Sequence, residues 1–179
     1  MMLVALIISG NLMMSNADTT VLIPKENAVS ISDRYEVLTM PCDKAVEYVF
    51  KNVPTVWTDS FYDDVGVIEM TDNVPQLKVG TNGVFYTYEN RIVANTVPAV
   101  LHELCHYVYR KIHIDDALFN TVKHEWLKRN AVPPMYADYE IDEEIFCRAL
   151  TDYFLTGNGV GCEQLVTKIT EVLLNEAVE

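Results

Sequence analysis

Residues 102–106 read His-Glu-Leu-Cys-His and combine groups that could bind a metal ion with one that could move a proton. Residues four positions apart lie on one face of an α-helix, so His102 and His106 could contact the same ion. Zn²⁺ prefers imidazole nitrogen, and a catalytic zinc site keeps one position open for water. Glu103 is next to the first histidine and could take a proton from that water, whose pKa the metal lowers towards neutrality. The pattern therefore predicts a zinc site at which a metal-activated water attacks a peptide carbonyl.

A catalytic zinc site of this kind needs a third protein ligand. The extended pattern HExxHxxGxxH would place glycine at 109 and histidine at 112, but the chain has Tyr109 and Ile112 there. His113 is one residue too late, and we expect it to lie at the C-terminal end of a helix, where the macrodipole favours a cation. The third ligand is therefore expected among the acidic residues that follow.

Residues 142–154 contain an acidic start followed by a helical apolar pattern. Ile145, Phe146, Ala149, Leu150 and Tyr153 form one apolar stripe that we expect to pack into the core. Glu144 lies at the N-terminal edge of this helix, on the side away from the centre of the stripe. Its carboxylate could therefore face the helix that carries His102.

Residues from about 80 to 155 resemble the short gluzincin peptidases, which include lethal-factor-like toxin peptidases and ImmA/IrrE-type regulatory peptidases. Their pattern is a pair of strands, then HExxH, then a helix that opens with a glutamate ligand. Here the strands correspond to 84–86 and 91–95, and the glutamate helix corresponds to 144–150. The resemblance implies a minimal zincin-like α+β fold, with a small twisted sheet, an edge strand, an active-site helix and a helical C-terminal part.

Carried over to this sequence, the resemblance makes Glu144 the third zinc ligand, with Glu143, Glu140 and Glu125 as alternatives. Several gluzincins have an acidic residue four positions after the ligand, where it orients a zinc-binding histidine. This chain has Arg148 at that position, and a guanidinium cannot accept a hydrogen bond. If Glu140 were the ligand, Glu144 would fill the orienting role, so the assignment stays open at this point.

A hydrolytic site also needs a hydrogen-bond donor for the oxyanion that forms on attack. Tyr136 and Tyr139 precede the acidic helix, where related peptidases often place a tyrosine. We favour Tyr136 as this catalytic donor. The alternative is that both tyrosines only pack against the surface.

Strands and helices must position these residues, and the hydrophobic pattern predicts most strands before most helices. This order is typical of an α+β fold. Thr96 is expected to cap the helix that carries the motif, with Pro98 in its first turn, and Asp142 to cap the acidic helix, which stops near Gly157. The strand at 84–88 is the expected edge, against which an extended substrate peptide would lie. The predicted strands are 34–40, 65–70, 84–88 and 91–94, and the predicted helices are 43–52, 96–111, 115–130, 143–155 and 162–176, with a loop at 131–141.

The chain has 179 residues, half of them hydrophobic, which suits one domain with a substantial core. We place that domain at 25–179, after a segment at 1–24 that is either a signal peptide or a tail. A signal peptide would make the protein secreted or periplasmic, and a tail would leave it cytoplasmic. The apolar run at 3–8 is far shorter than the roughly 20 residues that span a bilayer, so no transmembrane span is expected.

The formal net charge of −13 argues against nucleic acid as a partner, because such a surface repels phosphates. A peptide or protein substrate is expected instead, and the sequence does not predict an oligomeric state. Cys105 and Cys147 are expected to be buried free thiols, and the four cysteines do not indicate a disulfide framework. Two alternatives remain, namely a zinc-binding interaction protein without activity and a regulatory or toxin protease with a single protein target.

Overall fold

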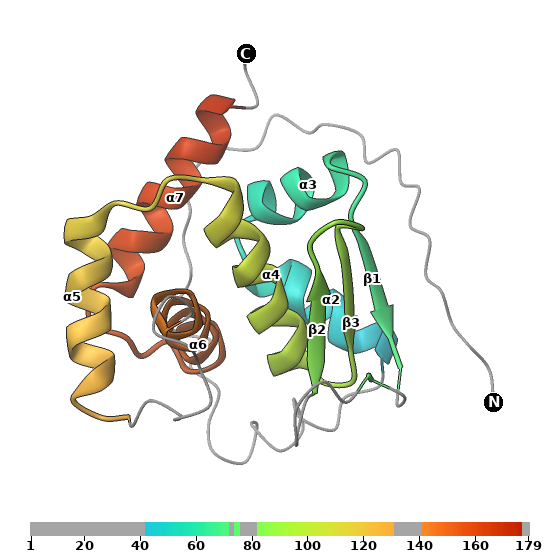
Figure 1. Ribbon diagram of the computed structural model, residues 1–179, viewed down its shortest axis with the longest axis horizontal. Coiled ribbons are helices and arrows are strands. Elements are labelled where there is room, and N and C mark those ends of the chain that lie inside the picture. Colours follow the sequence, from blue (N-terminus) through green and yellow to red (C-terminus); the bar gives the residue numbers. More distant parts are fainter. Residues whose placement is uncertain (1–41, 72–73, 76–81, 131–140, 177–179) are drawn as a thin grey trace.

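The computed structural model describes residues 42–71, 74–75, 82–130 and 141–176 (Figure 1). The predicted strand at 34–40, the segment at 1–24 and the loop at 131–140 lie outside these residues. So do Tyr136, Tyr139 and Glu140.

The described residues form six helices and one three-stranded sheet, which confirms the α+β class. Five of the predicted helices and three of the predicted strands are present, with ends shifted by up to three residues. One further helix, α3, was not predicted. In chain order the elements are α2 (Cys42–Asn52), α3 (Thr55–Asp63), β1 (Val67–Met70), β2 (Gly83–Tyr86), β3 (Arg91–Ala94), α4 (Val97–Lys111), α5 (Asp116–Leu127), α6 (Ile141–Thr156) and α7 (Cys162–Glu176).

Helix α3 begins with β-branched and aromatic residues, which have low helix propensity. It is stabilised by tertiary contacts, because Trp57 and Phe61, one turn apart, are both fully buried. The Trp57 indole N–H donates to the Thr170 hydroxyl of α7 at 3.2 Å, inside the core. Packing against α7 therefore overrides the local preference, and this is why the sequence pattern missed α3.

The ends of two elements correct the sequence prediction. Asp142 was predicted to cap α6, but the helix begins at Ile141 and the Asp142 carboxylate pairs with Lys123 of α5. Strand β1 begins at Val67 rather than 65, because Val65 has a φ of 61° and no β-branched residue continues a strand in that conformation. By contrast, the Thr96 hydroxyl accepts from the Ala99 N–H at 3.3 Å, so the predicted cap of α4 is confirmed.

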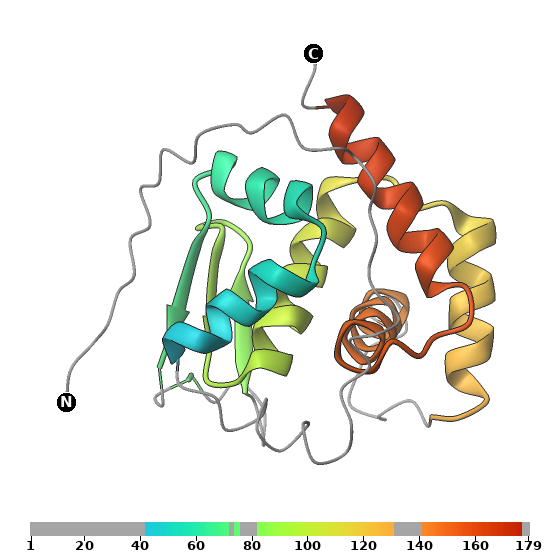
Figure 2. The same cartoon turned by 180° about the vertical axis from the view of Figure 1, so that it is seen from behind.

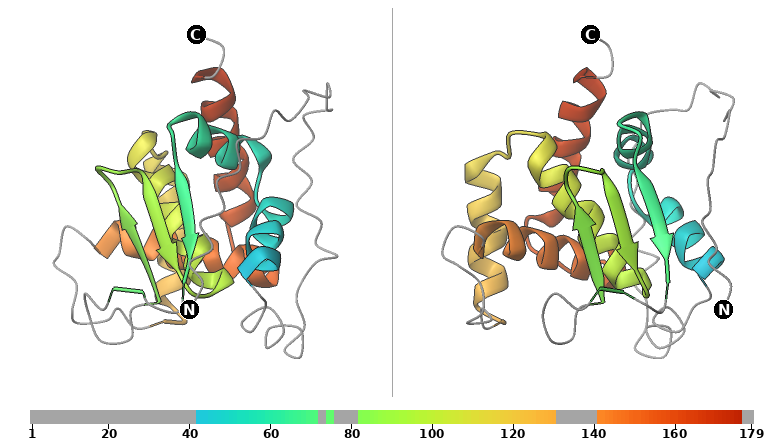
Figure 3. Two further views of the ribbon diagram at one scale, coloured as in Figure 1. Left: turned by 90° about the vertical axis from the view of Figure 1, so that its right-hand side faces the viewer. Right: turned by 45° about the vertical axis from the view of Figure 1, so that its right-hand side comes forward.

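The strand order is β1-β3-β2, with β1 parallel and β2 antiparallel to β3 (Figure 3). Strand β2 therefore lies at one edge of the described sheet, as predicted. One face of the sheet contributes Ile68, Met70, Ile92 and Ala94 to the core. The other face carries Arg91, which pairs with Glu69 and lies over the Tyr86 ring. That second face also carries Val84 and Val93, which are both buried. Helix α4 packs against the first face, where Gly83 faces Ala99 and Glu103.

Helix α4 lies in the middle of the molecule, with β2 and β3 on one side and α6 on the other (Figures 1 and 2). Its buried residues face both neighbours, so α4 is held on two sides. On the α6 side, Phe146 is fully buried, with its ring edge-on to those of Tyr109 and Phe119. The motif at 102–106 is thus on a helix that packs against the sheet on one side and against α6 on the other. Among the described residues, no helix combines the length and apolar character that crossing a membrane requires.

Candidate metal centre

Helix α4 places His102 and His106 one turn apart, and their Nε2 atoms lie 3.2 Å from each other. Both side chains are mostly buried but still reach the surface, with exposed fractions of 20% and 14%. Two nitrogens at this separation can bind one ion. The two histidines therefore lie on one face of α4, as the i, i+4 spacing predicts.

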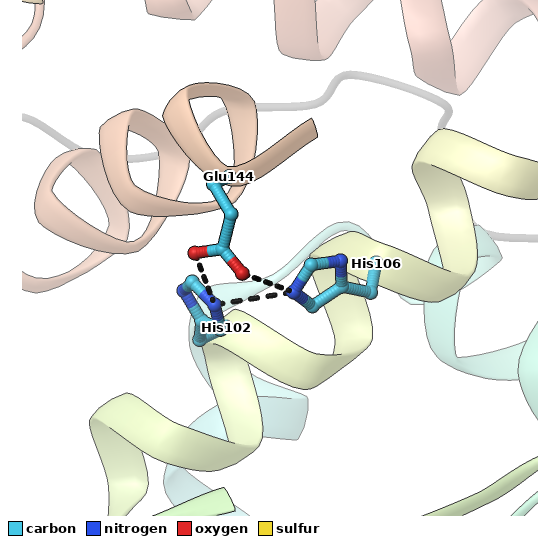
Figure 4. A group of neighbouring side chains, drawn as sticks. All are labelled: His102, His106 and Glu144. Atoms are coloured by element: carbon cyan, nitrogen blue, oxygen red, sulfur yellow. Dashed lines mark hydrogen bonds and ion pairs between the residues drawn. The ribbon is translucent and has the colours of Figure 1, made fainter. Parts of the chain in front are cut away.

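Glu144, from the first turn of α6, points its carboxylate at both histidines (Figure 4). Its Oε2 is 3.5 Å from Nε2 of His102, and its Oε1 is 3.6 Å from Nε2 of His106. Within the described part of the chain, these three residues form the group whose donor atoms lie close enough to hold a metal ion. The structure thus brings together the three residues that the sequence analysis selected as ligands.

The spacing of the donor atoms suits zinc. With zinc–ligand bonds of about 2.0–2.2 Å and tetrahedral angles, ligand atoms lie about 3.3–3.5 Å apart. The two Nε2 atoms are 3.2 Å apart, and each lies 3.5 or 3.6 Å from a different oxygen of the Glu144 carboxylate. In addition, Oε2 of Glu144 is buried, and its ion-pair contacts at 3.5 Å to His102 and Arg148 are longer than good hydrogen bonds. A buried carboxylate oxygen in this position is suited to a cation, so the residues fit a zinc ion.

Glu143 contacts the other side of the same histidine. Its Oε1 lies 2.7 Å from Nδ1 of His106, and the Arg110 guanidinium donates to the same carboxylate at 2.6 Å. A carboxylate at Nδ1 favours the tautomer that carries its proton there, which leaves the Nε2 lone pair for a metal.

The carboxylate that contacts Nδ1 of His106 thus comes from the residue before Glu144, whereas position 148 is an arginine. No sequence signal distinguishes Glu143 for this contact, because it depends on how α6 crosses α4. Of the other candidates for the third ligand, Glu125 on α5 pairs with Lys128. His113 is exposed, beyond the last residue of α4.

Glu103 points from α4 towards strand β2 and is almost fully buried, with an exposed fraction of 7%. Burial raises the pKa of its carboxyl, and the charges of His102 and His106 oppose this. A backbone hydrogen bond from Phe85 in β2 also opposes it. The carboxyl therefore has a raised pKa beside the two histidines, which suits a group that accepts a proton near neutral pH.

The charges of the other site residues are coupled. Burial alone would lower the pKa of His106, but the Cys147 side chain and the carboxylates of Glu143 and Glu144 raise it well above the usual range. Burial alone would raise the pKa of Glu144, but the two histidines beside the carboxylate hold it well below the usual range. Without a metal, a protonated histidine thus balances the acidic side chains of the site.

Three cysteines of the described residues are buried and free: Cys105, Cys147 and Cys162. This confirms the expectation for Cys105 and Cys147. Burial raises the pKa of Cys147 to about 11 and that of Cys162 to about 12. At neutral pH these thiols are therefore protonated, and they act as small apolar groups of the core.

Comparison of the chain with models of protein families, with curated protein sequences and with solved structures found no match. Function has to be inferred from the chemistry of the site itself.

Proposed function

We propose that this protein is a zinc-dependent peptidase with a zincin-like fold, in which His102, His106 and Glu144 hold the metal. The observation that carries the proposal is the convergence of two Nε2 atoms and one carboxylate within 3.2–3.6 Å of one another. This donor set leaves a fourth position for water, as in the gluzincin peptidases that the sequence resembles. When bound, zinc would supply a Lewis acid and a water of lowered pKa.

Glu103 is the proposed general base. It follows the first histidine ligand on α4, and burial raises the pKa of its carboxyl, so it can take a proton from water and later give it to the leaving amine. Glu143 holds the Nδ1 side of His106 and so fixes the direction of its Nε2. Tyr136, which lies outside the described residues, stays our proposed donor to the oxyanion.

The proposed substrate is a peptide in extended conformation, docked on the edge of β2. Asn82 accepts a backbone hydrogen bond from Asn95 of the segment that continues β3. Because backbone groups alternate along a strand, Val84 and Tyr86 then also face β3, while Gly83 and Phe85 face outward. An extended peptide could pair with these outward groups, beside Glu103.

The test combines metal content with turnover. Protein purified without added metal should contain about one zinc per chain and cleave members of a mixed peptide library. Glu103→Gln should keep the zinc and lose turnover by roughly 100-fold or more, because it removes the base and no ligand. A chain that neither contains nor takes up zinc would disprove the metal site. A zinc-loaded chain that cleaves no peptide would favour the alternative of a metal-binding interaction protein.

A further inference from the structure

Gly83, at the start of β2, lies directly against the side chain of Glu103. A Cβ atom built on Gly83 would be 2.9 Å from Oε1 and 3.0 Å from Cγ of Glu103, and 3.1 Å from Cβ of Ala99. Contacts below 3.0 Å do not occur at real Cβ atoms, so one of the two groups would have to move. Any side chain at position 83 therefore conflicts with the present position of the Glu103 carboxylate.

Phe85, two residues further along β2, contacts the same carboxylate through its backbone. Gly83 and Phe85 both point their backbone groups away from β3, as the bond between Asn95 and Asn82 requires. A hydrogen bond links the Phe85 backbone to Glu103, and a carboxylate can only accept, so the Phe85 N–H is the donor. The backbone of Phe85 thus holds the carboxylate of Glu103, and the missing side chain of Gly83 leaves the space that the carboxylate occupies.

We propose that the outer edge of β2 positions the general base, with the Phe85 N–H holding the Glu103 carboxylate and Gly83 leaving the space that it occupies. This inference rests on the proposed function, and it makes Gly83 a positioning residue. The proposal also limits where the substrate can bind, because the Phe85 N–H already donates to Glu103 and is not available to a peptide. An incoming peptide strand then pairs with the backbone of Gly83 and the carbonyl of Phe85, so that its own backbone passes beside the base.

A double-mutant cycle on thermal stability tests the contact without any substrate. Gly83→Ala should lower Tm by several degrees in the wild-type background, and clearly less in the Glu103→Ala background, where the obstructing side chain is gone. Gly159→Ala is the matched control, since its Cβ would meet Cys162 Sγ at 2.5 Å near the opposite end of α6. That control should lower Tm equally in both backgrounds. Equal effects of Gly83→Ala in both backgrounds would overturn the proposed contact.

Turnover and zinc affinity then test the positioning role. Gly83→Ala should lower kcat roughly 10- to 100-fold, because a small displacement of a catalytic group has effects of this size. Zinc affinity should be unchanged, since the atoms nearest to a side chain at position 83 belong to Glu103 and Ala99 and not to a ligand. An unchanged kcat with a raised KM would overturn the proposal, because it would assign Gly83 to substrate docking alone. If the zinc-loaded wild type cleaves no peptide, the proposed function fails, while the thermal cycle still decides whether the contact exists.

Discussion

Nδ1 of His106 lies 2.7 Å from Oε1 of Glu143, while Nε2 of the same ring faces the neighbouring residue of α6, Glu144. Two consecutive acidic residues thus contact opposite nitrogens of one histidine. Arg110 donates to Glu143 as well, which fixes that carboxylate from the α4 side. In the proposed site, one of the two glutamates is a ligand and the other sets the tautomer of the ligand beside it.

This arrangement predicts different losses of zinc affinity for two adjacent substitutions. Glu144→Ala removes a metal ligand and should abolish tight binding. Glu143→Ala removes only the partner of Nδ1 and should weaken binding by about 10- to 100-fold. Titration against a competing chelator measures both. Asp142→Ala is the control, because its carboxylate pairs with Lys123 and not with a histidine. If Glu143→Ala lost more zinc affinity than Glu144→Ala, then Glu143 would be the ligand and Glu144 the partner of the histidine.

Zinc binding should release protons and weaken as the pH falls. The pKa of His106 is raised, after the opposing effect of burial, by Cys147, Glu143 and Glu144, so the metal-free protein holds a proton on this ring at neutral pH. A metal must displace that proton, and therefore a higher proton concentration competes with zinc. Calorimetry in buffers of different ionisation enthalpy should detect the released proton. A zinc affinity that is independent of pH between about 6 and 8 would contradict this prediction.

Asp64 connects the end of α3 to α4 and should stabilise the fold only while it is ionised. Its carboxylate accepts from Tyr107 at 2.7 Å and from Lys111 at 2.6 Å. Burial alone would raise the pKa of Asp64, but these hydrogen bonds and the charge of Lys111 lower it overall. Because this pKa is lowered in the folded state, ionised Asp64 stabilises the fold at pH values above the pKa of the unfolded chain, about 3.9. That stabilisation is lost as the pH falls below this value.

Asp64→Asn should therefore reduce the free energy of unfolding at pH 7 by at most about 1 kcal/mol, because the pair is partly exposed. The difference from wild type should shrink when urea denaturation is repeated at pH 3. Asp63→Asn, at the neighbouring exposed position, is the control and should have little effect at either pH. If the difference in unfolding free energy between wild type and Asp64→Asn grew as the pH fell, the prediction would be wrong.

Phe146→Ala should destabilise the protein by about 3–5 kcal/mol, since it leaves a cavity in the core. The Phe146 side chain is fully buried, with its ring centre 5.1 Å from that of Tyr109 and 5.9 Å from that of Phe119. Denaturant unfolding measures the loss, and added zinc should recover part of it if the folded state binds the metal. Val160→Ala, at a position that is 60% exposed, should change stability by less than about 0.5 kcal/mol.

Local sequence was sufficient for the helix that carries the histidines. Thr96 caps α4 and Pro98 suits its first turn, so the start of the helix is encoded within three residues. The i, i+4 spacing then places His102 and His106 on one face, whatever the rest of the chain does. The strand at 91–94 and the stop of α6 at Gly157, which has a φ of 68°, are local in the same sense. Such features follow from short-range sterics and hydrogen bonds.

The tertiary structure decided which groups meet those histidines. Glu143 and Glu144 are neighbours in a helix, and only the crossing of α6 over α4 directs one to Nδ1 and the other to Nε2. The contact of Gly83 with Glu103 depends equally on how β2 lies against α4. Helix α3 exists because Trp57 and Phe61 are buried by distant residues. These contacts join residues from 20 to more than 100 positions apart in the sequence, and their geometry is fixed only when the apolar faces pack together, because hydrophobic burial itself has no direction.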